Sequence, residues 1–217
     1  MTESGVQDDS YIRTFFDSIE PSRDTIFILK STVLPGTTKE LKEKHGYKIV
    51  FCPEFLTEKT AKLDMLTQPR IVIGGEHLTR LQVLEIFKVR FGNKHYILTD
   101  ETTAEYIKYM SNIFLAVKVS TVNEFYRLGK VLGIDWNVAL EGFTSDPRIG
   151  NSHTAVPGHD GKLGFGGSCF PKDINALIQL SHQLGVEMNV LEAAWKTNLE
   201  VRPEQDWKQL KGRAVSA

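Results

Sequence analysis

The segment TAEYIKYMSNIFLAVKVSTVNEFYRLGKVLG, residues 103–133, decides the fold class of this chain. Apart from Gly129, no glycine or proline occurs in it before Gly133, and apolar residues return in steps of three and four. This spacing places the apolar residues along one face of a helix. The pattern predicts one helix of roughly 30 residues, well beyond the usual 10–14. One small domain cannot bury such a helix, so we expect it to join two domains or to pair with a partner chain.

The residues before this helix alternate between strand and helix patterns. Continuous apolar and β-branched runs predict buried parallel strands at 24–34, 47–52, 70–74 and 95–98. Helical spacing lies between them at 37–45, with Thr38 as N-cap and Gly46 as the stop, and at 78–91. This alternation predicts an α/β layer with a parallel sheet.

The residues after the long helix show helical patterns only. Helices are predicted at 135–144, 171–184 and 187–200, and residues 145–168 are a loop rich in Gly, Ser and His. The second half of the chain is therefore expected to be all-α.

The composition excludes several classes of protein. The 217 residues carry 26 Lys+Arg against 27 Asp+Glu, without a basic run, which argues against nucleic acid or an anionic membrane as partner. No stretch approaches 18 consecutive apolar residues, so no membrane-spanning helix is expected. The acidic N-terminus does not fit a secretory signal, and two cysteines do not make a disulfide scaffold, so a cytoplasmic location is expected. The histidines lack ligand spacing, so no metal site is expected.

Residues 164–173, GFGGSCFPKD, are the most informative segment for chemistry. The glycines let the backbone approach a ligand closely, and Pro171 suits the first turn of a helix. Cys169 would then lie just ahead of a helix N-terminus, where free N–H groups and the cation of Lys172 favour a nucleophilic thiolate. Asp173 is four residues further on, so it can share a face with Cys169 as base or orienting group.

Two other interpretations of this segment stay open. A lone cysteine is usually a buried structural thiol, and the local residues alone do not decide between that and a reactive thiol. A Gly-rich turn before a helix can also cradle phosphate, although such a turn normally follows a strand. Cys52 is the contrast, because it ends an apolar strand and is expected to be packed in the core.

Three weaker patterns concern polar residues near predicted elements. Glu54 and Glu58 stand four apart in PEFLTE, so one helical turn would stack their carboxylates. Lys108 and Asn112 have the same spacing on the long helix. Thr32 ends the first strand, at the edge of the sheet where α/β folds bind ligands. Spacing alone favours a solvated helix face for each pair, and a strand-end threonine is also ordinary turn chemistry.

The motifs KSTVLPGTT, PEFLTE, EYIKYMSN and GFGGSCFPKD, in this order, resemble the UDP-glucose 6-dehydrogenase family and the wider group of UDP-N-acetylmannosamine and GDP-mannose dehydrogenases. The resemblance extends from about residue 24 to residue 200. It implies a partial Rossmann-like parallel sheet, then a long central helix and a helical dimerisation domain. The implied domains are 1–100 as the remnant of an NAD-binding domain, 101–202 as the central catalytic and dimerisation domain, and 203–217 as the start of a linker.

The resemblance also implies an NAD-dependent four-electron oxidation of UDP-glucose to UDP-glucuronate. Cys169 would attack the aldehyde-level intermediate to give a thiohemiacetal, and hydride loss would leave a thioester. Asp173 and Thr32 would hold the water used in proton transfer, and Lys108 would stabilise the developing oxyanion. The implied catalytic residues are Cys169, Asp173, Lys108, Asn112, Thr32 and Glu58.

Binding roles follow from the same resemblance. Substrate contacts are implied for Glu54, Phe55, Leu56, Lys108, Asn112, Arg148, Phe165 and Gly166, and cofactor contacts for Thr32, Glu58 and Lys172. Arg148 would reach the sugar of a partner subunit, because in the family the long helix, here residues 103–132, is the core of a homodimer.

The sequence departs from the family pattern at both ends. The family begins with a GxGxxG turn and continues into a second α/β domain that grips UDP; neither is found in this sequence. We therefore expect weak binding of NAD and UDP-glucose and little or no turnover by this chain alone. Two alternatives to an active dehydrogenase stay open: a non-catalytic remnant or dimerisation module, and one half of a split enzyme.

Overall fold

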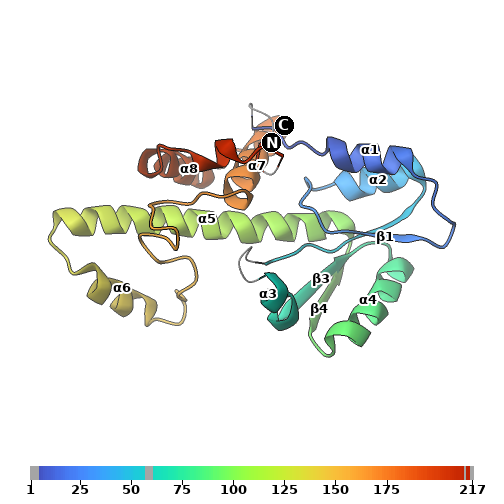
Figure 1. The fold of residues 1–217 in the computed structure, drawn as a ribbon, viewed down its shortest axis with the longest axis horizontal. Helices are drawn as coiled ribbons and strands as arrows, with labels where there is room; N and C mark the ends of the chain where they lie inside the picture. Colours follow the sequence, from blue (N-terminus) through green and yellow to red (C-terminus); the bar gives the residue numbers. More distant parts are fainter. Residues whose placement is uncertain (1–4, 57–60, 213, 216–217) are drawn as a thin grey trace. The chain divides into compact units, whose positions relative to one another are not determined.

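The computed structural model describes residues 5–56, 61–212, 214 and 215. Residue contacts divide the described chain into two compact units. One, here called the sheet unit, is Gln7–Met110; the other, called the helical unit, runs from Ser111 onward and includes Gly5 and Val6. Helix α5 (Glu101–Val131) begins in the first unit and continues in the second without interruption, which confirms the long predicted helix (Figure 1).

The described part of the sheet unit contains one sheet with the strand order β1-β2-β3-β4. The strands are β1 (Ile26–Leu29), β2 (Lys48–Phe51), β3 (Arg70–Gly74) and β4 (His95–Thr99), and the helices are α1 (Ser10–Ser18), α2 (Thr37–His45), α3 (Ala61–Thr67) and α4 (His77–Phe91). The four predicted strands are confirmed, although β1 is much shorter than the predicted run 24–34. Helices α1 and α3 were not predicted; α1 is amphipathic and as long as α2, so its apolar period was overlooked.

The fold class is confirmed with one difference in strand direction. β1 and β2 are parallel, as are β3 and β4, but β2 and β3 are antiparallel and pair only at Phe51 and Gly74. These two residues are the last of their strands. The carboxyl ends of β2 and β3 therefore meet, which brings the residues that follow both strands into one neighbourhood.

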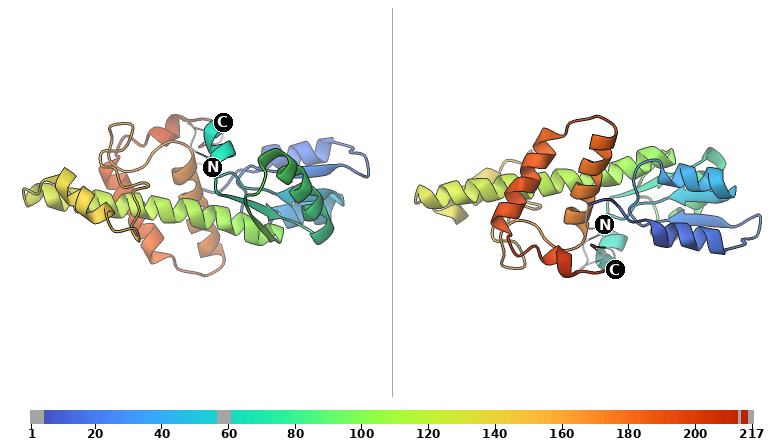
Figure 2. Two further views of the ribbon diagram at one scale, coloured as in Figure 1. Left: turned by 90° about the horizontal axis from the view of Figure 1, so that it is seen from below. Right: turned by 90° about the horizontal axis from the view of Figure 1, so that it is seen from above.

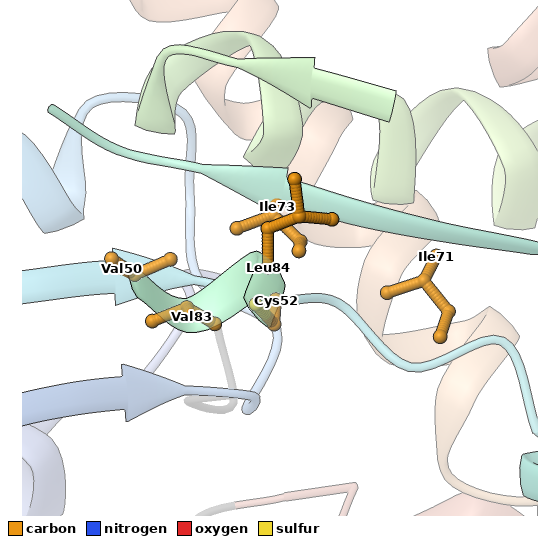
Figure 3. Packing of buried hydrophobic residues seen from close by; sticks show 6 residues of the cluster. All are labelled: Val50, Cys52, Ile71, Ile73, Val83 and Leu84. Carbon is orange, nitrogen blue, oxygen red and sulfur yellow. The ribbon is translucent and has the colours of Figure 1, made fainter. Parts of the chain in front are cut away.

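Apolar side chains on and just after β2, on β3 and on α4 form one of the buried clusters of the sheet unit (Figure 3). They are Val50, Cys52, Ile71, Ile73, Val83 and Leu84. Their burial is the main favourable contribution to the stability of this layer. Gly74 lies at the end of β3, where a Cβ atom would collide with Ala104 of α5. The glycine thus lets α5 begin close against the sheet.

The N-terminus of α2 is capped by a residue far away in the sequence. The predicted N-cap Thr38 is wrong, because the helix begins at Thr37 and its cap is Gly36, at φ +101°. Glu105 accepts hydrogen bonds from the backbone N–H groups of Gly36, at 2.6 Å, and Thr38, at 2.8 Å. Burial raises the pKa of this carboxyl group. The predicted stop at Gly46 is confirmed.

The helical unit contains the rest of α5, then α6 (Trp136–Thr144), α7 (Cys169–Gln183), α8 (Asn189–Val201) and a 3-10 turn, η2 (Asp206–Gln209). These helices confirm the three predicted ones, and residues 145–168 are a loop as expected. Asp135 caps α6 by accepting from the N–H groups of Asn137 and Val138. α7 and α8 lie side by side (Figure 2), and Ser120 of α5 donates to the carbonyl of Ala194 in α8.

Among the described residues, no helix is both long enough and apolar enough to cross a membrane.

Candidate active site

The candidate residues of the sheet unit gather where the strands end. Lys108, in α5, is 3% exposed, and its ammonium group donates to the backbone carbonyl of Glu54. It also lies 3.4 Å from a carboxylate oxygen of Glu54. Since β4 leads directly into α5, the sheet places Lys108 beside the segment that follows β2. The structure therefore brings together two residues that the sequence presents as separate patterns.

The segment after β2 is not helical. Residues 52–56 form neither helix nor strand, and the Glu54 carboxylate accepts from the N–H of Leu56 at 2.8 Å. The helical turn expected to stack Glu54 on Glu58 does not include Glu54, and Glu58 lies outside the described residues. The Phe55 ring is contacted by Arg70, 4.3 Å from its centroid, and by Lys108, 5.3 Å away. Two cations thus hold the Phe55 ring.

Sequence reasoning missed Lys30 in this neighbourhood. Its ammonium donates to the carbonyl of Cys52 at 3.1 Å, and burial lowers the pKa of Lys30. Cys52 itself is 1% exposed, as expected, and burial raises the pKa of its thiol to about 12. The available signal was spacing, because Lys30 stands two residues before Thr32 and shares its side of an extended chain. Thr32 is partly exposed, and its carbonyl accepts from Gln7 at 2.6 Å.

The helical unit presents Cys169 as the first residue of α7, which confirms its predicted place at a helix N-terminus. Cys169 is exposed, so it is not a buried structural thiol. The N-cap residue Ser168 makes no side-chain cap hydrogen bond, and Pro171 lies in the first turn as predicted. The first N–H groups of a helix carry a partial positive charge that favours a thiolate.

Asp173 lies one turn further along α7 with a fully buried side chain. Asn112 donates to one carboxylate oxygen at 2.5 Å, and the ammonium group of Lys172 donates to the other. The structure therefore joins the predicted residues Asn112 and Asp173. The expectation that Lys172 favours the thiolate is wrong, because Asp173 balances its charge. Its contact with a cofactor stays a prediction.

Two predicted substrate contacts belong to the backbone of the glycine-rich loop. Phe165 is 5% exposed, and its N–H and carbonyl groups are both hydrogen-bonded by the side-chain amide of Asn198. At Gly166 a Cβ atom would stand 2.5 Å from the guanidinium carbon of Arg202. The glycine is required by this packing. Contact of Phe165 and Gly166 with a substrate stays a prediction.

Arg148 is exposed in the loop after α6. Its guanidinium group pairs with Asp146 at 2.6 Å and holds the pKa of that carboxyl group below its usual value. Lys118 of α5 donates to the carbonyls of Ile149 and Gly150, at 2.9 and 2.8 Å, which fixes the residues after Arg148. Arg148 thus precedes an anchored stretch of backbone, and its side chain, paired with Asp146, is 87% exposed.

The candidate site therefore consists of two parts, each with internal hydrogen bonds. Thr32, Glu54 and Lys108 belong to the sheet unit, and Asn112, Cys169 and Asp173 to the helical unit. That these residues line one cleft stays a prediction.

Comparisons with known proteins agree with the motifs. The model for the NAD binding domain of the UDP-glucose/GDP-mannose dehydrogenase family matches residues 1–89, and the model for its central domain matches residues 102–200. The UDP-glucose 6-dehydrogenase of Rickettsia bellii is 37% identical over 207 residues, covering 91% of this chain and 46% of that protein. The UDP-glucose 6-dehydrogenase AglM of Haloferax volcanii is 36% identical over 195 residues, covering 83% and 44%.

A solved structure extends the likeness to the fold. The UDP-glucose dehydrogenase of Pyrobaculum islandicum matches with a TM-score of 0.81 at 33% identity, over 98% of this chain and 50% of that chain. The chain thus spans about half the length of the relatives it matches. The strand and helix order, the thiol at the start of α7 and these matches lead to one conclusion: the chain belongs to the UDP-glucose/GDP-mannose dehydrogenase family.

Proposed function

We propose that this chain supplies the catalytic thiol and the oxyanion-stabilising cation of an NAD-dependent UDP-glucose 6-dehydrogenase. The observation that carries the proposal is the exposed Cys169 at the uncapped start of α7, with the Asp173 carboxylate bonded by Asn112 and Lys172 one turn behind it. The names of the Rickettsia bellii and Haloferax volcanii relatives support the same activity.

The fold family implies NAD, and the described residues fit only part of that molecule. The start of α2 lies after β1, but the N–H groups of Gly36 and Thr38 are already bonded by Glu105. This helix N-terminus therefore does not offer those donors to a pyrophosphate. Thr32, partly exposed after β1, would contact the cofactor together with Glu58 and Lys172, with Glu58 near the nicotinamide. NAD, when bound, would accept a hydride in each of two oxidations, so that a primary alcohol and one water become a carboxylate, two NADH and three protons.

The chain's own groups would move protons and stabilise charge. Asp173 and Thr32 would hold the water that takes the proton of the sugar hydroxyl. Cys169 would then add to the aldehyde carbon, forming the C–S bond while Lys108 balances the negative charge on oxygen. Once the second hydride has left, the thioester would be cleaved by a water beside Glu58, which releases the carboxylate and restores the thiol.

The sugar nucleotide would be positioned by side chains of both units. Glu54 presents a carboxylate beside Lys108, which supports a role for residues 54–56 at the sugar hydroxyls. Asn112, Phe165 and Gly166 would contact the sugar from the helical unit, and Arg148 would reach the sugar of a second subunit.

The same proposal includes a homodimer through residues 103–132. Its support is a row of large apolar side chains exposed on the helical-unit part of α5: Phe114 at 71%, Phe125 at 50%, Leu128 at 59% and Val131 at 85%. Such a surface normally has a partner. Size measurement in solution should give a dimer, and Phe114→Asp should give monomers. A monomeric parent protein would contradict this part of the proposal.

We also propose a cytoplasmic location, because both cysteines are free thiols, which is usual in a reducing compartment.

A chimaera tests the activity without depending on the length of this chain. This chain would replace the matching residues of the Rickettsia bellii relative, and NADH formation would be followed with NAD and UDP-glucose. We expect turnover that falls by about a thousandfold or more in Cys169→Ser, because the nucleophile is lost. Turnover that survives in the variant, or a folded but inactive chimaera, would favour the non-catalytic alternative. The 217-residue chain alone, assayed in parallel, should turn over far more slowly.

A further inference from the structure

The glycine-rich loop before Cys169 is held by hydrogen bonds to side chains of α5 and α8. Asn123 of α5 accepts from the N–H of Gly164 at 3.0 Å. Asn198 of α8 accepts from the N–H of Phe165 at 2.7 Å and donates to its carbonyl at 3.0 Å. Both asparagines are at most 1% exposed. The loop backbone therefore has buried partners of the kind that a neighbouring strand would supply in a sheet.

Arg202 completes this support. Its guanidinium group donates to the Leu163 carbonyl at 3.3 Å, to Asp160 at 2.5 Å and to Asp206 at 2.6 Å. Asp206 in turn accepts from the N–H of Gly167 at 3.3 Å. Arg202 is only 3% exposed, so its charge depends on these carboxylates. One buried side chain thus joins the chain before the loop, the loop itself and the turn η2.

The packing around Gly166 leaves no room for a side chain at this position of the loop. A Cβ atom on Gly166 would stand 2.5 Å from both the guanidinium group of Arg202 and the carboxylate of Asp206. The ring of Phe165, in the loop, contacts the ring of Trp195, with 6.1 Å between centroids. Trp195 in turn contacts Trp207, with 5.3 Å between centroids. Packing and hydrogen bonds therefore agree on a single arrangement of residues 164–167.

We propose that Arg202 is a positioning residue of the thiol: with Asp206 it holds residues 163–167 so that the chain enters α7 with Cys169 at the N-terminal N–H groups. Taking Cys169 as the reacting thiol rests on the proposed function. Without the planar guanidinium fork of Arg202, the Leu163 carbonyl loses its donor and Asp206 is no longer held at the N–H of Gly167. The first turn of α7 then frays, and the thiolate loses the helix terminus that stabilises it.

The test is the alkylation rate of Cys169 by iodoacetamide in the full chain, followed by mass spectrometry, with amide exchange measured in the same samples. Arg202→Lys keeps the charge and removes the fork, and Asp206→Asn keeps the shape and removes the charge. Arg127→Lys is the matched control, because Arg127 makes an exposed ion pair with Glu200 in the same unit. We expect both test variants to slow alkylation about threefold or more and to speed exchange at Gly167 about tenfold, with the control unchanged.

Alkylation in both test variants that equals or exceeds the parent rate would overturn the proposal. So would exchange that rises equally along α5, α7 and α8, since that pattern means general destabilisation. These measurements need neither NAD nor a sugar nucleotide. An inactive chimaera would therefore refute the proposed function and leave the positioning result standing. Conversely, an active chimaera with unchanged alkylation in the variants would refute the positioning role alone.

Discussion

Two loops that carry candidate residues are held in different ways. In the sheet unit, the segment 52–56 follows a strand, and the ammonium groups of Lys30 and Lys108 donate to its carbonyls. In the helical unit, residues 163–167 join no strand. Carboxylate and amide side chains accept from their N–H groups, and the buried Arg202 donates to the Leu163 carbonyl. The sheet ladder gives the first loop its place and cations complete it. A loop between helices has no ladder, so its whole arrangement depends on buried side chains.

The two thiols show the same contrast, and their chemistry gives the largest expected effect. Burial raises the pKa of Cys52 to about 12, so its thiolate fraction at pH 8 is about a thousandfold below that of an ordinary exposed cysteine. We expect Cys169 to react with iodoacetamide faster than Cys52 by about this factor. Labelling of Cys52 should rise about tenfold per pH unit up to its pKa, since only the thiolate reacts.

The measurement uses peptide mass spectrometry on the folded protein, with Cys52→Ser and Cys169→Ser variants to assign the rates. Equal rates for the two cysteines would remove the contrast between the units.

The next largest effect is expected on the rate of NADH formation when Lys108, in the sheet unit, is replaced. Lys108→Met in the active chimaera should lower NADH formation about a hundredfold, because one donor to the developing oxyanion is lost. Lys39→Met is the control, since Lys39 is exposed in the same unit. Circular dichroism checks that both variants are folded. A loss below threefold would mean that Lys108 only supports the Glu54 backbone.

Helix caps extend the comparison to stability. Glu105→Gln should lower the free energy of unfolding by about 2 kcal/mol, because one amide oxygen replaces a carboxylate that accepts from both Gly36 and Thr38. Urea unfolding measures the change, and Glu43→Gln, an exposed position on α2, is the control. A change no larger than that of the control would show that α2 does not need its distant cap.

The local cap in the helical unit should matter less. Asp135→Ala should cost about 1 kcal/mol, because the side chain accepts from the first-turn N–H groups of α6 at 3.0 and 3.3 Å from an exposed position. Urea unfolding of this variant is compared with Asn137→Ala, a change in the same turn that leaves the cap intact. If Asp135→Ala lowered the free energy of unfolding more than Glu105→Gln, the exposed cap would matter more than the buried one, against this expectation.

Features with a local cause were predicted well. The period of the apolar residues predicted α5 to within a few residues, and the β-branched runs located the four strands. Pro171 and the glycines before it predicted a helix from residue 171 with Cys169 at its N-terminal end, and α7 begins two residues earlier, at Cys169. The antiparallel pairing of β2 with β3 was missed, because an apolar β-branched run predicts a strand but not its direction in the sheet.

Features that join distant parts of the chain were missed. Glu105 caps a helix that begins 68 residues before it, and no pattern near Thr37 announces this. Arg202 and Asp206 show helical spacing, but a surface ion pair would show the same spacing. Only the structure reveals that Arg202 is buried beneath Gly166.

By itself, the sequence determined which elements form and which residues have the chemistry: a thiol before a helix, a lysine on the long helix and a carboxylate one turn after the thiol. These depend on neighbours within a few residues, where periodicity and capping act. The tertiary structure alone decided which partners hold them: Glu54 for Lys108, Asn112 for Asp173, and Arg202 for the thiol loop. Burial removes water as a partner, so each polar group must find another in the folded chain, however distant in sequence.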